Sequence, residues 1–414
     1  MKVLHLSTAD LEGGAGRAAL RLHKGLVNTN VQSQMLVRAK SSATASVKSD
    51  SSILTKVGPV VDRLYLKWNN CHRAKSKFSP QWFLDTTAAQ IKAINPDIVH
   101  LHWICNGFVR IESLKKIQHP IVWTLHDMWP FTGGCHYSDG CTYYEKGCGK
   151  CPQLGSSNQK DLSAQILNRK MNAWKDLNLT IVAPSRWLAD CVRKSALFGQ
   201  RRVKIIHNGI DTQIFRPIDK LLARQLLNLP AVSKIILFGA GNPTEDPRKG
   251  FSLLVNALRS LKLEDGNPYE LVILGAEAPI NPVDLEFKAH YLGKLSDEIA
   301  LALAYSAADV FVAPSKEDNL PNTVVEALAC GIPCVAFNIG GMPDMIDHQI
   351  NGYLAQPFDE KSLAFGIQWV LQNEERYKSL CAFAQHKVDN SFTIQNQLNQ
   401  FSKLYQDILS GPSC

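Results

Sequence analysis

The sequence predicts an α/β protein made of two doubly wound, Rossmann-like domains that face a cleft. Short apolar runs alternate with amphipathic stretches along most of the 414 residues, which is typical of parallel sheets with helices on both faces. These runs form two series, and the first strand of each leads into a glycine-rich turn. With 45% apolar residues, the chain is large enough to bury two hydrophobic cores.

The strands of both series are short runs rich in Val, Ile and Leu. In the first series they are expected at 2–7, 34–38, 97–102, 121–126, 179–183 and 204–207. In the second series they are expected at 234–238, 270–274, 289–292, 309–313 and 333–337. A turn-rich connector at 208–217 divides the series, so we place the domains at 1–206 and 207–390. Apolar and aromatic residues at helical spacing predict a terminal helix within 391–414.

Composition limits where the protein can work. There is no apolar run of 18 residues, so no membrane-spanning helix is expected. The start of the chain reads as a first strand and not as a signal peptide. Eleven cysteines without an export signal favour a reducing compartment. We therefore expect a cytoplasmic protein.

The charge is unevenly distributed between the two halves. Residues 1–206 hold 29 Lys or Arg against 13 Asp or Glu, whereas 207–414 hold 16 against 24. A basic half favours an anionic partner, such as phospholipid headgroups on the inner face of a membrane or a diphosphate-linked acceptor. The basic residues accompany no nucleic-acid-binding motif, so no nucleic acid is expected as a partner.

A stretch rich in Ser, Thr and Ala at 41–52 is expected to be a mobile loop. Basic and aromatic or apolar residues are interleaved after it: Arg63, Leu64, Leu66, Lys67, Trp68, Arg73, Lys75, Lys77, Phe78, Trp82 and Phe83. Such a stretch can lie on a membrane surface, or its aromatic residues can pack against their own domain. The sequence leaves both interpretations open.

Two acids near the strand at 309–313 form the most informative pattern in the chain. A Pro-Ser turn follows this strand and leads to Asp318, and Asn322 and Thr323 then open a helix that carries Glu326. A carboxylate this close to a helix start faces whatever binds the free N–H groups there. Seven residues separate the two acids, so both can reach one small polyol ligand.

Other polar groups stand where ligands bind in open α/β sheets, beyond the strand ends. Gly13 and Gly14 follow the first strand, and His126 ends the strand at 121–126. His100 and His102 lie at another strand end and are further candidates for lining the cleft. In the second domain Gly241 follows the first strand.

Arg248 and Lys249 stand at the next helix start of the second domain. Two fixed cations beside helix N–H groups suit a diphosphate.

These motifs together resemble the family-four group of retaining GT-B glycosyltransferases. The resemblance implies that Glu326 holds the ribose hydroxyls of a nucleotide-sugar donor and that Asp318 lies by the transferred sugar, where the family usually has Glu. It also implies that His126 hydrogen-bonds the donor sugar, and that the terminal helix crosses back onto the first domain. The residues it places around the donor phosphates and sugar are Gly13, Gly14, Gly241, Arg248, Lys249, Asn319, Leu320, Asn322 and Thr323.

The resemblance implies transfer of a sugar, with retention, to a glycan or lipid-linked acceptor in cell-surface polysaccharide biosynthesis. No Asp-x-Asp motif follows a strand in a suitable place, so catalysis without a divalent metal is expected. A nucleotide-sugar-binding regulator of weak activity is the alternative, because Asp318 is one methylene shorter than Glu. A Rossmann dehydrogenase is disfavoured, since neither glycine turn has the dinucleotide fingerprint.

A cysteine-rich loop is the last candidate site. Cys135, Cys141, Cys148 and Cys151 lie in a Gly- and Tyr-rich segment with few apolar residues. Four thiols with a closing C-x-x-C fit a structural Zn²⁺ site. Two disulfides or free thiols remain open. The loop resembles one in a polysaccharide-biosynthesis subgroup of the same family, with the Trp-Pro-Phe-Thr-Gly-Gly-Cys-His segment at 129–136.

Overall fold

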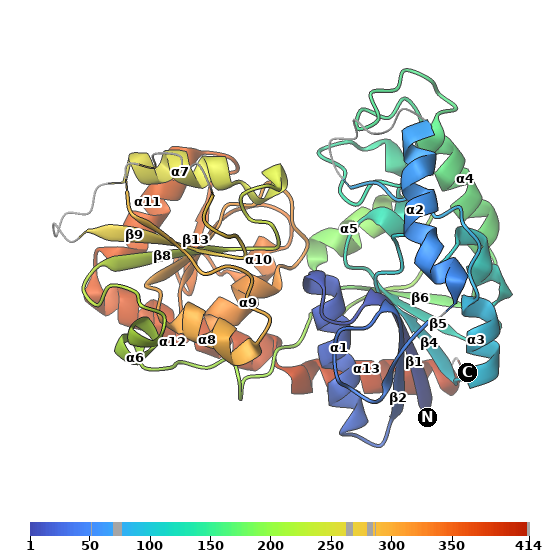
Figure 1. Cartoon of the computed structure of the whole chain (residues 1–414), viewed down its shortest axis with the longest axis horizontal. Coiled ribbons are helices and arrows are strands. Elements are labelled where there is room, and N and C mark those ends of the chain that lie inside the picture. Colours follow the sequence, from blue (N-terminus) through green and yellow to red (C-terminus); the bar gives the residue numbers. More distant parts are fainter. Residues whose placement is uncertain (51, 69–76, 262–267, 280–284, 286, 412–414) are drawn as a thin grey trace. The chain divides into compact units, whose positions relative to one another are not determined.

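The computed structural model of the chain describes all residues except 51, 69–76, 262–267, 280–284, 286 and 412–414. The chain divides into two compact units, coloured by sequence in Figure 1. One consists of Met1–His207 together with Gln397–Cys414, and the other of Asn208–Asn396. Each unit contains one sheet in which all strand pairs are parallel. The predicted fold class, two Rossmann-like α/β domains, is therefore confirmed.

The first unit has a seven-stranded sheet in the order β3-β2-β1-β4-β5-β6-β7. Its strands are β1 (Lys2–Ala9), β2 (Gln32–Ala39), β3 (Val47–Ser49), β4 (Ile98–Leu101), β5 (Ile121–Thr124), β6 (Leu179–Ala183) and β7 (Val203–Ile205). Its α-helices are α1 (Gly13–Val27), α2 (Ile53–Trp68), α3 (Thr87–Ile94), α4 (Leu162–Trp174), α5 (Arg186–Lys194) and α13 (Ile394–Leu409). Short 3₁₀ turns are η2 (Ile111–Lys116), η3 (Trp129–Phe131) and η4 (Tyr143–Glu145).

The second unit has a six-stranded sheet in the order β10-β9-β8-β11-β12-β13. Its strands are β8 (Lys234–Gly239), β9 (Tyr269–Leu274), β10 (Ala289–Tyr291), β11 (Val310–Ala313), β12 (Cys334–Phe337) and β13 (Gly352–Ala355). Its helices are α6 (Lys220–Leu226), η5 (Pro247–Lys249), α7 (Phe251–Arg259), α8 (Glu298–Ser306), α9 (Asn322–Ala329), α10 (Met342–Met345), α11 (Glu360–Leu371) and α12 (Glu374–Ser391).

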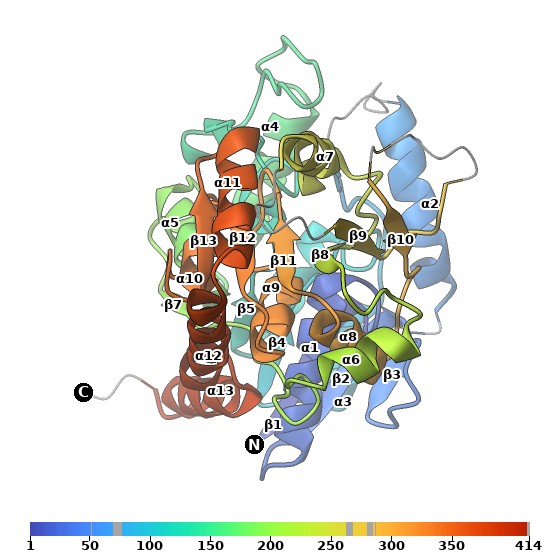
Figure 2. The ribbon, with the colours of Figure 1, turned by 90° about the vertical axis from the view of Figure 1, so that its left-hand side faces the viewer.

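Helices cover both faces of the second sheet, as Figures 1 and 2 show. Helices α7 and α11 bury apolar residues against one face, and α8, α9 and α12 against the other. The strands are apolar on both faces for this reason, which is why they read in the sequence as continuous apolar runs.

The chain reverses its direction of winding between β1 and β4 in the first sheet and between β8 and β11 in the second. Carboxyl ends of strands at such a reversal are where open α/β sheets bind ligands. The turn after β1 and the loops after β8 and β11 are therefore the places to examine for a site.

Two strands differ from the sequence-based expectation. Within 41–52, expected to be a loop, β3 (Val47–Ser49) pairs in parallel with β2, because the single apolar residue Val47 is buried beside Met35. The edge strand β13 was not predicted, since its segment has only four residues and begins with Gly. Both are four residues or shorter, so little periodicity marks them.

The basic and aromatic stretch divides into two parts. Helix α2 ends at Trp68, which is 81% exposed, and Leu64 is also exposed. Phe78, in contrast, is buried, and Trp82 lies under the guanidinium of Arg169 at 3.7 Å. Arg73 and Lys75 lie outside the described residues. Phe78 and Trp82 thus pack on their own unit. Within α2, Tyr65 and Leu66 also pack against the core of this unit, whereas Leu64 and Trp68 are exposed.

A search of the described helices finds none that is long and apolar enough to cross a bilayer.

Candidate active site

The loop acid Asp318 follows β11 and is paired with a lysine from a distant segment. Lys249 Nζ lies 2.6 Å from Asp318 Oδ2, and the two side chains are only 15% and 9% exposed. The Asn319 backbone N–H donates to Oδ1 at 3.1 Å, and Ser315 Oγ lies 3.3 Å from Oδ2. Burial alone would raise the pKa of Asp318, but Lys249 and Arg248 outweigh it and hold the pKa below its usual value. The carboxyl group is therefore ionised at neutral pH.

Arg248 holds the same loop through the backbone. Its guanidinium Nη1 donates to the carbonyl oxygen of Glu317 at 3.0 Å, and Nη2 pairs with Asp246 Oδ2 at 3.0 Å. Asp246 also caps the η5 turn by accepting from the Arg248 N–H. Both cations expected to meet a diphosphate are thus already paired with carboxylates of their own unit.

Two glycines let these segments approach closely. Gly250 has φ +72°, and a Cβ there would lie 1.9 Å from the Pro314 carbonyl oxygen. Gly340 has φ +52°, and a Cβ there would lie 2.0 Å from the Asp318 carbonyl oxygen. A side chain at either position would displace the acid loop. Gly340 was missed by the sequence analysis, although the Gly340-Gly341 pair after a strand was a usable signal.

Glu326, the second acid, lies in α9 and is 3% exposed. Tyr305 Oη, from the last turn of α8, donates to Glu326 Oε2 at 2.7 Å. Tyr305 is itself fully buried, with its ring beside Phe215 and Phe311. The orientation of the Glu326 carboxylate is therefore fixed by a rigid neighbour, Tyr305, which no sequence motif had indicated.

Helix α9 begins at Asn322, as predicted. Its N-cap residue is Pro321, whose side chain forms no cap. Asn322 Oδ1 accepts from Asn208 Nδ2 at 3.2 Å. Asn319 and Leu320 are buried, and Thr323 is half-buried. The residues expected near donor phosphates thus surround one helix start.

Gly241 lies in the exposed turn after β8, where a Cβ would meet nothing within 4 Å. Nothing within the second unit requires glycine at this position.

In the first unit the glycine-rich segment forms the first turn of α1, whereas the sequence placed it before the helix. Gly13 has φ +71°, and a Cβ on Gly16 would lie 2.8 Å from the Ala9 carbonyl oxygen. The close approach of helix to strand thus depends on Gly16, whereas a Cβ on Gly13 would meet nothing within 4 Å. The turn is anchored by Asp10, whose carboxylate accepts from the backbone N–H groups of Ser41 and Ser42 at 2.9 Å each.

His126 follows β5 and begins a chain of hydrogen-bonded imidazoles. His126 Nε2 lies 3.2 Å from His102 Nδ1, and His102 Nε2 lies 3.1 Å from His5 Nδ1. Burial lowers the pKa of His126 to about 4, and it lowers the pKa values of His5 and His102 well below the usual value. All three rings are therefore neutral at pH 7, and His126 can offer a hydrogen bond but no positive charge.

His100 and His102, which were expected to line a cleft, are buried inside the first unit. His100 Nδ1 lies 2.7 Å from Tyr405 Oη of α13, and Nε2 lies 2.8 Å from Thr124 Oγ1. His100 is thus a packing residue that connects β4 to the terminal helix.

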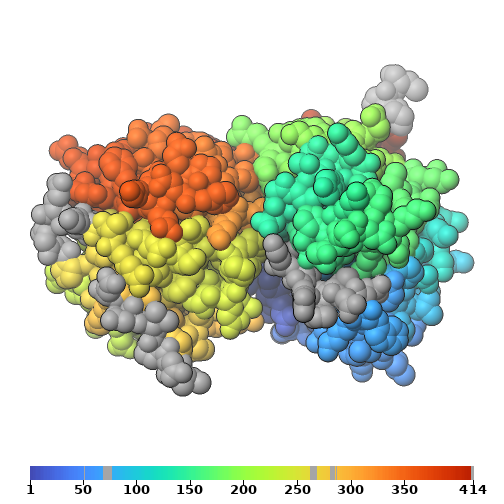
Figure 3. All heavy atoms as spheres, turned by 90° about the horizontal axis from the view of Figure 1, so that it is seen from above, coloured from blue at the N-terminus to red at the C-terminus, as the bar shows by residue number. Residues whose placement is uncertain are grey.

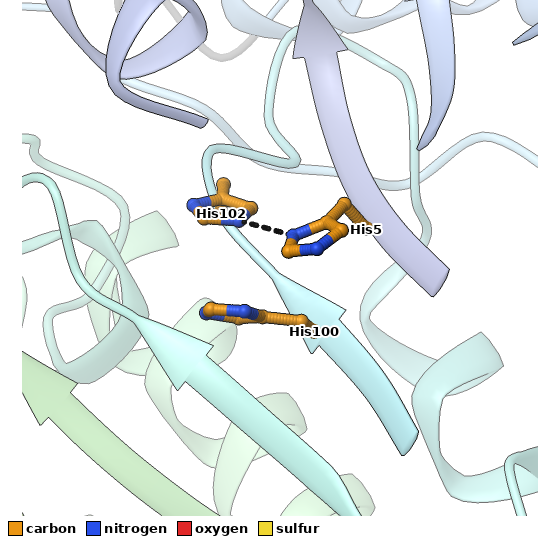
Figure 4. A group of neighbouring side chains, drawn as sticks. All are labelled: His5, His100 and His102. Atoms are coloured by element: carbon orange, nitrogen blue, oxygen red, sulfur yellow. Dashed lines mark hydrogen bonds between the residues drawn. The ribbon is translucent and has the colours of Figure 1, made fainter. Parts of the chain in front are cut away.

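Figure 4 shows His5, His100 and His102, whose nearest nitrogens lie within 4.8 Å of one another, a spacing compatible with metal ligands. The rings of His100 and His102 stack at 4.3 Å. Imidazole lone pairs lie in the ring plane, so stacked rings do not direct them to a common point. The hydrogen bonds described above use the ring edges instead, which favours a hydrogen-bonded cluster over a metal site.

Asp127, next to His126, serves a different partner. Its Oδ2 accepts from His136 Nδ1 at 2.6 Å and from Trp103 Nε1 at 2.7 Å, and Oδ1 accepts from the Trp129 N–H. Asp127 therefore fixes the loop after β5 and does not form a dyad with His126.

The four cysteines of the loop line a single cavity of about 20 Å³, with Phe78, Tyr143 and Tyr144 among its other walls. All four are free, so neither disulfide of the sequence-based alternatives is present. Burial raises the pKa of Cys148 to about 12 and that of Cys135 still further.

Comparison with solved structures identifies the architecture as GT-B. Sucrose-phosphate synthase from Thermosynechococcus elongatus superposes with a TM-score of 0.73 at 18% identity, covering 99% of each chain. HepE from Anabaena, solved in complex with UDP and glucose, superposes with a TM-score of 0.66 at 16% identity, covering 98% of this chain and 99% of HepE.

Sequence comparison then gives the family. Residues 12–214 match the model of Glycosyltransferase Family 4, and residues 240–387 match that of Glycosyl transferases group 1. WcaC of Escherichia coli strain K12, assigned to colanic acid biosynthesis as a glycosyl transferase, is 25% identical over 358 residues, which are 81% of this chain and 83% of WcaC. The chain belongs to the family-four, group 1 glycosyltransferases, as its motifs indicated.

Proposed function

We propose that this glycosyltransferase moves a sugar from a nucleotide-sugar donor to a glycan or lipid-linked acceptor of cell-surface polysaccharide, with retention of configuration. The observation that carries the proposal is the pair of buried carboxylates on either side of one helix start, Asp318 held by Lys249 and Glu326 held by Tyr305. The similarity to WcaC supports the polysaccharide role, and the UDP and glucose bound by HepE support a nucleotide-sugar donor.

The proposed roles follow from the contacts of each residue. Glu326 accepts hydrogen bonds from the ribose hydroxyls, because Tyr305 occupies one side of its carboxylate and fixes its direction. The start of α9 offers N–H groups to the diphosphate. Asp318 lies by the transferred sugar, and His126 donates or accepts a hydrogen bond as a neutral ring.

The leaving nucleoside diphosphate gains negative charge as the bond to the anomeric carbon breaks. Lys249 and Arg248 are the cations proposed to stabilise it. Since both are paired with Asp318 and Asp246 in this structure, the diphosphate would share them with these acids. A shared lysine would couple the position of Asp318 to the presence of the donor. We propose that these groups act without a divalent metal.

A binding screen tests the proposal. UDP-, GDP- and ADP-sugars are titrated into the protein by calorimetry, and each donor that binds is incubated without acceptor in buffer free of Mg²⁺ and Mn²⁺. Binding with slow release of the nucleotide is the expected result. Binding without hydrolysis or transfer to any glycan would instead indicate the regulatory alternative, and the absence of any binding would contradict both.

We further propose that the first unit meets its acceptor at an anionic membrane surface through α2. The exposed face of this helix carries five apolar residues at helical spacing, Ile53, Val57, Val60, Leu64 and Trp68. Three exposed cations, Lys56, Arg63 and Lys67, are interleaved with them, and the single acid of the helix, Asp62, is buried. An apolar stripe edged with positive charge suits an anionic lipid surface.

A further inference from the structure

The four cysteine side chains of the loop all line one cavity of the first unit. The four cysteines, from a segment that runs from the end of η3 to the start of α4, line a cavity of about 20 Å³, which is room for roughly one water or one metal ion. The green segment that contains this loop lies on the face seen in Figure 3.

The backbone of the loop is shaped to keep the closing C-x-x-C turned inward. Gly149 has φ +140°, and a Cβ there would lie 2.3 Å from the Gln159 carbonyl oxygen. The Cys151 N–H donates to Asp161 Oδ2 at 2.7 Å, and Asp161 is also the N-cap of α4. Cys151 is thus fixed to a rigid helix start, and its carbonyl oxygen accepts from the Leu154 N–H at 3.2 Å.

A buried cation beside the cavity supplies an independent observation. Lys170 of α4 is fully buried. Its ammonium donates to the carbonyl oxygens of Trp129 and Thr132 and lies 3.8 Å from the Trp129 ring centroid. Among the described residues it forms no ion pair. The nearby carboxylate of Asp127 is already engaged by His136 and Trp103.

A buried ammonium without a counter-charge is costly. Thr132, whose carbonyl oxygen accepts from the Lys170 ammonium at 2.9 Å, is three residues before Cys135, and ionised Cys135 or Cys148 would raise the pKa of Lys170. Lys170 is therefore placed where negative charge on the loop cysteines would compensate it.

We propose that Cys135, Cys141, Cys148 and Cys151 bind one Zn²⁺ as thiolates, and that Lys170 is the counter-charge of this centre. Each thiol releases one proton to solvent on binding, so the centre carries a net charge of −2 beside one ammonium. Four thiolates leave no open position on the metal, so the site is structural. It holds the loop after His126 in one shape and takes no part in sugar transfer.

Zinc would draw the sulfurs together. A tetrahedral centre with Zn–S distances of about 2.3 Å sets the sulfurs about 3.7 Å apart. Of the described side chains, only the histidine cluster has three ligand atoms within 4.8 Å of one another, so the four sulfurs are more widely spaced here. Changes of χ1 within the cavity are the movement that the proposal requires.

Metal analysis of the whole chain, purified in reducing buffer, is the direct test. We expect about one Zn²⁺ per chain and, after exchange with Co²⁺, the thiolate-to-metal charge-transfer bands of a tetrahedral site. Cys148→Ser should lose the metal, whereas Cys191→Ser, at a half-buried cysteine of α5 that does not line the cavity, should keep it. If Cys148→Ser fails to fold, the unmodified protein is treated with a chelator instead, and removal of zinc should make four thiols titratable.

Lys170→Met tests the counter-charge. Loss of this outer-shell cation should lower metal affinity by about 10–100-fold in a chelator competition. Folded, freshly purified protein that contains no zinc in reducing buffer would overturn the metal site, and so would disulfides found by mass spectrometry in reduced, freshly prepared protein. Unchanged metal affinity in Lys170→Met would overturn the role of the lysine. None of these readouts depends on the proposed donor or acceptor.

Discussion

Replacing Lys249 with Met should both destabilise the second unit and change the state of Asp318. The substitution keeps the length and the apolar stem of the side chain but removes the ammonium that lies 2.6 Å from Asp318 Oδ2. The carboxylate would then be buried with only neutral donors, Ser315 Oγ and the Asn319 N–H, close to it.

The size of the effect follows from the burial of the pair. Removing one partner of a buried ion pair costs about 3–5 kcal/mol, and we expect about 3 kcal/mol here, since Lys249 is 15% exposed. In a double-mutant cycle with Asp318→Asn, the coupling energy should be about 2 kcal/mol. The double variant should be more stable than Lys249→Met alone, because it no longer buries an unpaired charge.

The pH dependence has a definite sign. In the unmodified protein the folded-state pKa of Asp318 lies below its unfolded value, so the pair stabilises the fold above pH of about 4 and this contribution is lost as pH falls through the folded pKa. In Lys249→Met the folded pKa should rise above the unfolded value, so the carboxylate destabilises the fold at pH 7. The stability difference between the two proteins should therefore shrink as the pH is lowered from 7 to 4.

Hydrogen exchange followed by mass spectrometry on peptides from 308–330 measures the free energy of unfolding of the second unit alone. Urea unfolding gives a second measure of it. Lys316→Met, at an exposed lysine of the same loop, is the matched control. A coupling energy below about 0.5 kcal/mol, or a stability difference that is the same at pH 7 and pH 4, would refute the reasoning.

Three further predictions follow from the same structure. Glu326→Gln should weaken donor binding by about 1.5–3 kcal/mol in calorimetry, since a charge-assisted hydrogen bond is lost. Glu374→Gln, on the surface of α12, should leave donor binding unchanged. Equal donor affinities of Glu326→Gln and the unmodified protein would contradict the ribose role. The protein should bind vesicles that contain anionic lipid, and salt should weaken this binding. Trp68→Ser should reduce the binding, whereas Leu226→Ser, at an exposed leucine of the other unit, should not. Equal binding to neutral vesicles would count against the α2 surface. Burial lowers the pKa of His23 to about 4, so on acidification the unfolded chain binds a proton at this histidine before the folded chain does. The free energy of unfolding should therefore fall by up to about 1.4 kcal/mol for each pH unit below 6.5. The stability of His23→Gln should be less sensitive to acid between pH 7 and 5.5, and an unchanged sensitivity would show that this histidine does not contribute.

The sequence by itself determined the two-sheet architecture and the chain segments that carry each candidate site. Buried parallel strands are apolar on both faces, so β1 and β11 could be located from composition alone. The acids Asp318 and Glu326 and the start of α9 are local in the chain, since nine residues of loop and helix contain them all. The family membership rests on the same local motifs.

Only the tertiary structure decided which partners these residues have. Lys249 meets Asp318 across 69 positions of the chain, and His100 meets Tyr405 across 305. Such pairs depend on strand order and on the crossovers between strands, which no local pattern encodes.

The same holds for the charges. The sequence presented Lys249 as a free cation for a diphosphate, whereas the fold pairs it with the loop acid. It also gave no sign that Lys170 would be buried beside the cysteine loop, because a lysine on an amphipathic helix is usually exposed. Burial and the distance to a neighbour set the state of a charge, and both are properties of the folded chain and not of its local sequence.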